Sequence, residues 1–280
     1  LMEEIIMEPI IVDYDKCNAD GICADVCPRK LIVVDAEDSM PRPIPEAVEL
    51  CINCGHCLAV CPTGAITLNE IVPEKCPPIN KRLWPDYDQL EQLLKSRRSI
   101  RVYKDKPVDS EIIETLLETC RFAPSGSNGQ PVNWIIATGS KRLKDLAQLV
   151  IDWMSHAVET KQPIAERLKL DVVVKGWERG QDRIFRGAPM VIMTHALGTA
   201  SLPQESCVIA MTYLDLAAAS MGLGACWVGY LMLAATQHAP LKEALGIPQD
   251  HRLYGAMVVG YPQYSYRRIP PRNQPRVVLW

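Results

Sequence analysis

The chain has 280 residues, 48% of them hydrophobic, and a formal net charge of −3 at pH 7, so it is long for one domain and about right for two. The charge is uneven, because residues 1–75 carry 14 acidic and 5 basic side chains whereas residues 76–280 carry 19 and 25. The basic residues of the larger part are dispersed and not interleaved with aromatic residues, which argues against a nucleic-acid partner and favours a small anionic ligand.

No stretch of the sequence predicts a membrane span or export. The longest apolar run, near residues 208–224, is interrupted by Thr212, Asp215 and Ser220 and is too short for a bilayer, so we expect a buried helix there. The first ten residues lack the basic region and cleavage site of a secretory signal. We therefore expect a cytoplasmic protein without a membrane partner, in which clustered cysteines bind metal or carry out redox chemistry rather than form disulfides.

The first 75 residues contain a duplicated cysteine-rich unit. Short strands are expected at PIIV (9–12) and LIVV (31–34), and AITL (65–68) repeats the arrangement after the second cysteine group. The first group, CNADGICADVCP (17–28), has Asp20 where the second cysteine of a bacterial ferredoxin run would stand.

The second group is complete. CINCGHCLAVCP (51–62) matches C-x₂-C-x₂-C-x₃-C-P, in which three cysteines bind one [4Fe–4S] cluster and the fourth binds the other cluster. One cluster would then be held by Cys51, Cys54, Cys57 and Cys27. The second would be held by Cys17, Cys23 and Cys61, with Asp20 at the remaining corner. A pair of zinc knuckles is the weaker alternative, since zinc has no use for the x₃-C-P spacing.

Three interpretations of Asp20 stay open. Its carboxylate could bind one iron of a [4Fe–4S] cluster, more weakly than a thiolate does. That iron could instead be absent, which leaves [3Fe–4S], or the cluster could have been lost. Cys76 could replace the missing ligand, and His56 is expected to be an exposed spacer.

A connector separates the two parts of the chain. PEKCPPINKRLWP (73–85) holds four prolines and no apolar periodicity. We predict a two-cluster ferredoxin-type domain at 1–75, a proline-rich linker at 76–86 and a second domain at 87–280.

The second domain is predicted to be α+β. Helical periodicity appears in DYDQLEQLLKS (86–96) and DSEIIETLLETC (109–120), the latter with Asp109 available as an N-cap. Short apolar runs bounded by Gly and Pro predict buried strands at NWIIAT (133–138), PMVIMTH (189–195), ACWVGYL (225–231) and YGAMVVGY (254–261). Residues 150–185 could form a helical excursion over a pocket.

Two segments of this domain suggest a ligand. RRSIRVYKDKPV (97–108) places three arginines and a serine within five positions, and APSGSNGQPVNW (123–134) has small and amide residues before a strand. With GAPMVIM, GLGACWVGYL and LYGAMVVGYP, they are the landmarks of the nitroreductase-like flavoprotein family, which the chain resembles from Tyr87 to its end. The resemblance implies a central antiparallel or mixed sheet flanked by helices, and a homodimer with FMN at its interface.

The resemblance also implies roles for individual residues. Arg97, Ser99 and Arg101, together with Arg98, would grip the FMN phosphate, and Arg268 or its neighbour Arg267 would complete the clamp. The flavin bound mainly to the partner subunit would be reached by Pro124, Ser125, Gly126 and Asn128. The backbone of Cys226, Trp227, Val228 and Gly229 would face the flavin N5 edge. Several family members have an acidic residue where this chain has Val228, so only the backbone role carries over.

The expected function is therefore an FMN-dependent oxidoreductase whose iron–sulfur clusters relay single electrons to or from the flavin. The resemblance suggests a small electron-poor substrate such as a nitro compound or a quinone, with NAD(P)H or a ferredoxin as donor. The alternative is an electron carrier that relays between partner proteins and has no small-molecule substrate. A roomy pocket beside residues 150–185 would favour the enzyme.

Overall fold

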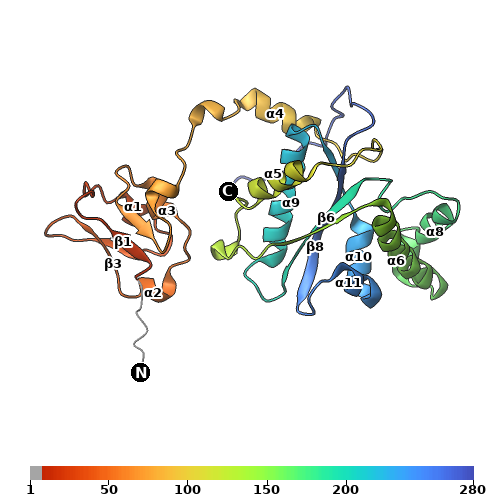
Figure 1. The fold of residues 1–280 in the computed structure, drawn as a ribbon, viewed down its shortest axis with the longest axis horizontal. Coiled ribbons are helices and arrows are strands. Elements are labelled where there is room, and N and C mark those ends of the chain that lie inside the picture. Colours follow the sequence, from red (N-terminus) through yellow and green to blue (C-terminus); the bar gives the residue numbers. More distant parts are fainter. Residues whose placement is uncertain (1–7) are drawn as a thin grey trace. The chain divides into compact units, whose positions relative to one another are not determined.

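The computed structural model describes residues 8–280, so the first seven residues, part of the stretch that bears on export, lie outside it. The chain divides into two compact units, Leu1–Trp84 and Pro85–Trp280 (Figure 1). The division falls within the linker expected at 76–86.

The first unit is built from short elements. Its regular elements are β1 (Ile10–Val12), α1 (Ile22–Val26), β2 (Ile32–Val34), β3 (Pro41–Pro43), α2 (Ala47–Leu50), α3 (His56–Val60), β4 (Ile66–Leu68) and the 3₁₀ turns Pro73–Lys75 and Lys81–Leu83. β1 pairs antiparallel with β4, and β2 pairs antiparallel with β3. The sequence did not predict β3, because two of its three residues are proline, which lacks the N–H of an inner strand and is tolerated at a sheet edge.

The duplication seen in the sequence is also structural. α1 and α3 pack together, and each follows a left-handed glycine, Gly21 with φ 70° and Gly55 with φ 76°. Both helices end at a cysteine in nearly the same extended conformation, Cys27 with ψ 113° and Cys61 with ψ 115°. Two equivalent turns therefore present the two cysteine groups to one small core, which contains Cys23, Cys27, Cys57 and the apolar residues of β1, β2 and β4.

The second unit is a four-stranded antiparallel sheet covered by helices on both faces. The strands β5 (Asn133–Thr138), β6 (Met190–Leu197), β7 (Gly224–Trp227) and β8 (His251–Gly260) stand in the order β5-β6-β8-β7. Its helices are α4 (Tyr87–Ser96), α5 (Ser110–Cys120), α6 (Ser140–Glu159), α7 (Pro163–Arg167), α8 (Leu170–Glu178), α9 (Pro203–Ser220), α10 (Gly229–Gln237) and α11 (Ala239–Leu245), with a 3₁₀ turn at Gly126–Asn128.

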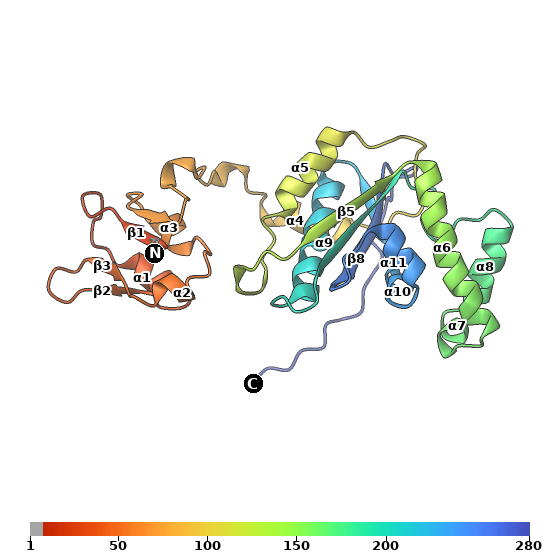
Figure 2. The same ribbon diagram turned by 60° about the horizontal axis from the view of Figure 1, so that its bottom comes forward.

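The two faces of this sheet have separate cores. α5 and α9 cover one face through residues such as Leu116, Met211 and Leu214, and α6, α10 and α11 cover the other (Figure 2). β6 is buried along almost its whole length because it is an inner strand with both faces covered. The α+β class and the flanking helices are thus as predicted.

The helices account for the remaining expectations. The apolar run near 208–224 lies in α9, whose inner residues are buried. Among the helices of residues 8–280, none has the length and apolar character of a membrane span.

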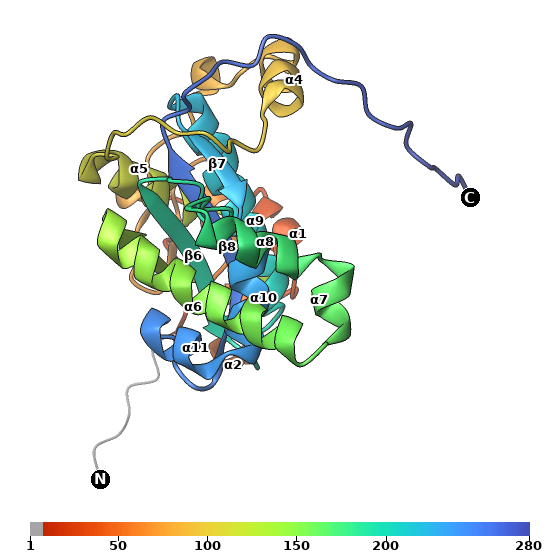
Figure 3. The same cartoon turned by 90° about the vertical axis from the view of Figure 1, so that its right-hand side faces the viewer.

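The segment 150–185 is helical, with α7 and α8 packed beside α6 (Figure 3). One strand is shorter than expected: β7 ends at Trp227 and α10 begins at Gly229, because Leu231, Ala234 and Ala235 pack into the core as a helical face. Asp109 precedes α5, but its side chain makes no capping hydrogen bond.

Candidate functional site

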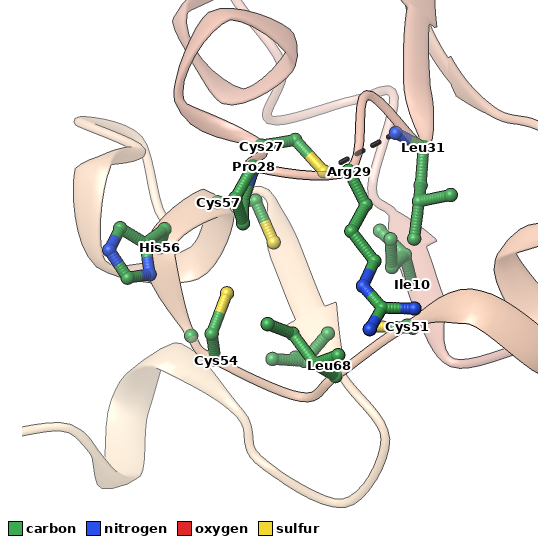
Figure 4. A pocket seen from close by; sticks show the side chains of 12 residues that line it. Ile10, Cys27, Pro28, Arg29, Leu31, Cys51, Cys54, His56, Cys57 and Leu68 are labelled. Carbon is green, nitrogen blue, oxygen red and sulfur yellow. Dashed lines mark hydrogen bonds between the residues drawn. The ribbon is translucent and has the colours of Figure 1, made fainter. Parts of the chain in front are cut away.

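Four of the predicted cluster ligands line one cavity in the first unit. Cys27, at the end of α1, and Cys51, Cys54 and Cys57, before and within α3, surround a small cavity with Ile10, Leu31 and Leu68 (Figure 4). The sequence assigned these four cysteines to one cluster even though Cys27 belongs to the other repeat. A soft thiolate set with an apolar lining fits the requirements of a [4Fe–4S] cluster.

The electrostatic interactions that affect the thiol pKa values group the cysteines into the same two sets. Burial raises the pKa of the Cys57 thiol to about 11, and the neighbouring Cys51, Cys54 and Cys27 add to the increase. Burial also raises the pKa of Cys23, with contributions from Cys17 and Cys61. Such thiols ionise unfavourably unless a cation compensates, as bound iron would do.

Backbone N–H groups point at several of the sulfur atoms. Leu31 donates to Cys27 Sγ (3.3 Å), and at the equivalent position Ala65 donates to Cys61 Sγ (3.2 Å). Ala19 donates to Cys17 Sγ (3.4 Å). Although burial opposes ionisation of Cys61, hydrogen bonds from Thr63 and from nearby backbone N–H groups leave its pKa lowered.

Asp20 occupies the position that Cys54 has in the other repeat. It is exposed, and its Oδ1 accepts a hydrogen bond from Ile22 N–H at 3.2 Å. No three His, Cys, Asp or Glu side chains within residues 8–280 converge on a single ion. A cubane takes one ligand at each iron, so its ligands surround it rather than meet at one point.

Cys76 and His56 are the other candidate ligands of the first unit. Cys76 is half-buried against the core of the unit, and its Sγ lies 3.6 Å from Val72 O. His56 is exposed at the start of α3, as expected, and it borders the four-cysteine cavity.

In the second unit, the arginine-rich segment is anchored to the sheet and to α9. Ile100 N–H donates to Ala225 O at 3.0 Å, and the approach is so close that a Cβ on Gly224 would clash with Ile100 Cγ1. Arg97 Nη1 forms a salt bridge with Asp215 Oδ2 at 3.1 Å. Burial raises the pKa of Asp215, and Arg97 opposes the increase.

Asp215 is a residue that sequence reasoning missed as a site residue. In the sequence it appears only as an interruption of an apolar run, and its position as an acid among the buried aliphatic residues of α9 is the signal that could have identified it. A buried carboxylate needs a partner, and the guanidinium of Arg97 supplies it.

The predicted phosphate-binding residues are only partly brought together. Arg97 and Arg98 border a cavity of about 270 Å³ that is also lined by Asp215, Tyr264 and Tyr266. Ser99 and Arg101 are not part of its lining; Arg101 is exposed, with Nη1 3.5 Å from Ser99 O. Arg268 does not line the cavity; it follows Tyr266 by two residues in the exposed C-terminal segment, which has no helix or strand after Pro262.

The predicted partner-facing loop, residues 124–128, contacts α9 near the start of that helix, away from Asp215. Gly126 N–H donates to Ser206 Oγ (3.4 Å) near the start of α9, and Ser125 Oγ accepts from Gln130 N–H (3.0 Å). Pro124 and Asn128 flank this turn. Nine residues of helix separate Ser206 from Asp215, roughly 13 Å at 1.5 Å per residue. One subunit thus presents the two predicted groups at separate places along α9.

The segment 226–229 makes the turn from β7 into α10. Cys226 and Val228 are buried, whereas Trp227 and Gly229 are exposed. Val228 N–H donates to Ala256 O at 2.9 Å, so this amide is already used. The amide of Gly229, in the first turn of α10, has no acceptor within the helix and is the better candidate to meet a ligand.

A third cavity lies beside the segment 150–185. It measures about 560 Å³ and is bordered by Leu143, Lys144 and Gln148 of α6, by Trp177 of α8, and by residues of the following loop such as Phe185. Trp177 Nε1 donates to Gln148 Oε1 at 2.9 Å, which joins the two helices. The space is large enough for a small organic molecule.

Family models match both parts of the chain. Residues 94–261 match the nitroreductase family, and residues 15–66 match a 4Fe-4S dicluster domain. A 5,6-dimethylbenzimidazole synthase from Rhodospirillum rubrum is 27% identical over 195 residues, which cover 64% of this chain and 84% of that protein. An uncharacterized ferredoxin from Methanocaldococcus jannaschii is 39% identical over 66 residues, 24% of this chain and 84% of that protein.

Among solved structures, an FMN-bound nitroreductase from Bacteroides fragilis shares the fold. It superposes with a TM-score of 0.56 at 20% identity and covers 68% of this chain and 98% of its own.

Proposed function

Because the chain belongs to the nitroreductase family and carries a 4Fe-4S dicluster domain, we propose that it is an FMN-dependent oxidoreductase with an internal iron–sulfur relay. When bound, FMN supplies two-electron chemistry and the clusters supply one-electron transfer. The observation that carries the proposal is the cavity in which cysteines of both repeats meet, in the same chain as the nitroreductase domain. In this proposal 1–75 is the relay domain, 76–86 the linker and 87–280 the flavin domain.

In this proposal two interleaved ligand sets hold the clusters. Cys27, Cys51, Cys54 and Cys57 bind a [4Fe–4S] cluster, supported by their shared cavity. Cys17, Cys23, Cys61 and Asp20 hold the second, as [4Fe–4S] or [3Fe–4S], supported by the mutual influence of the first three thiols. The N–H groups of Leu31, Ala65 and Ala19 stabilise the thiolates.

The flavin would lie at the interface of a homodimer. Arg97, Arg98, Ser99, Arg101 and Arg268 of one subunit are proposed to bind the phosphate, with Asp215 orienting Arg97. Pro124, Ser125, Gly126 and Asn128 of the second subunit would reach the same flavin. Gly229 is proposed to donate its amide to the flavin edge, beside Cys226, Trp227 and Val228.

A small electron-poor acceptor, such as a nitro compound or a quinone, is the proposed substrate, with NAD(P)H or a reduced ferredoxin as donor. The cavity between α6 and α8 favours an enzyme over an electron carrier, since a carrier needs no space for a small molecule.

The test is to delete residues 1–75 and compare the truncated protein with the full chain under anaerobic conditions. Each protein is mixed with NADH, NADPH or reduced ferredoxin in a stopped-flow instrument, and flavin reduction and turnover of nitrobenzene and a quinone are recorded. We expect the truncated protein to remain a dimer with FMN and to react with chemical reductants but no longer with ferredoxin. If ferredoxin reduces the truncated protein as fast as the full chain, the clusters are not on the electron path. If neither protein turns over either acceptor with any donor, the electron-carrier function is the better description.

A further inference from the structure

The two cysteine repeats differ at the residue that follows each Cys-Pro pair. Thr63 follows Cys61 and Pro62, and its Oγ1 lies 3.6 Å from Cys61 Sγ. At the equivalent place Arg29 follows Cys27 and Pro28, and it borders the four-cysteine cavity. The backbone leaves both cysteines in the same conformation, so the two side chains approach the two clusters from equivalent positions.

The side chain of Arg29 runs along the cavity. In Figure 4 it extends from the turn after Cys27 toward the side on which Cys51 lies. Among the residues bordering this cavity there is no carboxylate and no lysine, and the remaining titratable groups are His56 and the four thiols. Within residues 8–280 no salt bridge engages Arg29. Its guanidinium is thus a permanent positive charge at the border of the four-cysteine cavity, on the side of Cys51.

Hydrogen bonds to sulfur are present in both repeats. Cys61 and Cys17 receive the N–H groups of Ala65 and Ala19 and the contact with Thr63, and on the four-cysteine side Leu31 N–H donates to Cys27 Sγ. Hydrogen bonds to sulfur and net charge both set the reduction potential of such clusters. The two sites differ in charge, because Arg29 borders the four-cysteine cavity at the place where the other repeat has the hydroxyl of Thr63.

We infer that Arg29 sets the reduction potential of the cluster held by Cys27, Cys51, Cys54 and Cys57. Reduction adds one electron, and therefore one negative charge, to an already anionic cluster. A nearby guanidinium stabilises the reduced form more than the oxidised form, so Arg29 makes this cluster easier to reduce. The inference rests on the part of the proposed function that assigns these cysteines to a cluster.

The test uses the full-length protein with its clusters assembled. Wild type, Arg29→Gln, Arg29→Met and Arg29→Lys are titrated anaerobically with dithionite, and the reduced four-iron and oxidised three-iron signals are followed by EPR. Gln and Met both remove the charge, but Met keeps an apolar side chain over the cavity, so lost charge is separated from lost packing. Arg42→Gln is the matched control, because Arg42 pairs with Asp38 at 2.6 Å and does not border the cavity.

We expect Gln and Met to weaken the electron affinity of the four-iron cluster by about tenfold, a shift of about 59 mV to more negative potential. Lys should retain most of the wild-type potential, and Arg42→Gln should shift it much less. Because Arg29 is exposed, the difference between wild type and Gln should shrink at high salt.

Two results would overturn the inference: equal potentials in wild type and both uncharged variants at unchanged iron content, or an equal shift in Arg42→Gln. The ligand assignment is tested separately by the iron and sulfide content of wild type and Cys54→Ala. If Cys54→Ala keeps the full wild-type content, the assignment of the four-cysteine cluster fails, and the inference about Arg29 fails with it.

Discussion

Arg97 Nη1 lies 3.1 Å from Asp215 Oδ2, and the acid is the more buried partner, with 12% of its side chain exposed against 28% for the arginine. The pair joins the arginine-rich segment to the middle of α9. The pair is therefore expected to stabilise the second unit as well as to form part of the proposed phosphate site.

Asp215→Ala should lower the free energy of unfolding by about 2 kcal/mol. Removing one partner of a fully buried pair costs about 3–5 kcal/mol and an exposed pair contributes about 0–1, and this pair lies between those cases. Urea unfolding followed by tryptophan fluorescence measures the change. Glu118→Ala is the control, because the pair of Glu118 with Arg121 is exposed. Equal free energies of unfolding of the two variants would show that the buried pair contributes no more to stability than the exposed pair.

Arg101→Ala should weaken FMN binding by about ten- to a hundredfold, since a hydrogen bond to a charged group contributes about 1.5–3 kcal/mol. Arg97→Ala should do the same and should also lower stability, because it leaves Asp215 unpaired. Equilibrium dialysis of FMN gives the affinities, with Arg121→Ala as the control on an exposed surface. Unchanged flavin content in both Arg97→Ala and Arg101→Ala would place the phosphate elsewhere.

Asp20→Cys should convert the second cluster into an ordinary four-iron cubane. A carboxylate holds iron more weakly than a thiolate does, so protein purified in air should contain one stable [4Fe–4S] cluster and one that is [3Fe–4S] or readily becomes so. Iron content and EPR before and after the substitution measure the difference. Asp20→Asn is the matched control, because it keeps the shape without the ligand charge. An iron content near that of a single cluster in anaerobically prepared wild type would mean that the second site is empty.

The pair His195 and His251 should make stability depend on pH. Their Nδ1 atoms are 2.9 Å apart, and burial, helped by His251, lowers the pKa of His195 below its usual 6.5. The unfolded chain therefore takes up a proton at a pH where the folded chain does not, and stability present above about 6.5 is lost as the pH falls toward the lowered pKa.

Urea unfolding between about pH 7.5 and 5.5 tests this dependence. The free energy of unfolding of wild type should decrease more over this range than that of His195→Gln. His156→Gln is the control, because His156 is exposed and should keep the wild-type slope. Identical slopes in wild type and His195→Gln would contradict the expectation.

Periodicity and spacing predicted most of the architecture. The four strands of the second unit stand where short apolar runs lie between Gly and Pro, and the grouping of Cys27 with Cys51, Cys54 and Cys57 followed from the C-x₂-C-x₂-C-x₃-C-P spacing. These features can be predicted because each depends on residues close together in the sequence. A strand buried on both faces is a continuous apolar run, and one turn places several thiols at fixed spacing.

Other features depend on residues far apart in the chain. Nothing near Arg97 indicates that its partner is Asp215, and the use of the Val228 amide by Ala256 follows from the pairing of β7 with β8. The strand at Pro41–Pro43 contradicts the local propensity of proline and forms because the β2 backbone offers it a partner. In the first two cases the partner lies far away in the chain, and in the third a neighbouring strand overrides the local preference of proline.

The exchange of cysteines between the repeats has a consequence for how the first unit assembles. In the proposed ligation, Cys27 of the first repeat completes the cluster of the second repeat, and Cys61 of the second repeat completes the cluster of the first. Each cluster is therefore an inorganic cross-link between the two halves of the first unit. Neither half can then mature alone, because its last ligand arrives only when the other half is in place. Iron insertion at one centre should order the turn that supplies the other centre, so the unit should pass from apo to fully loaded in a nearly all-or-none step.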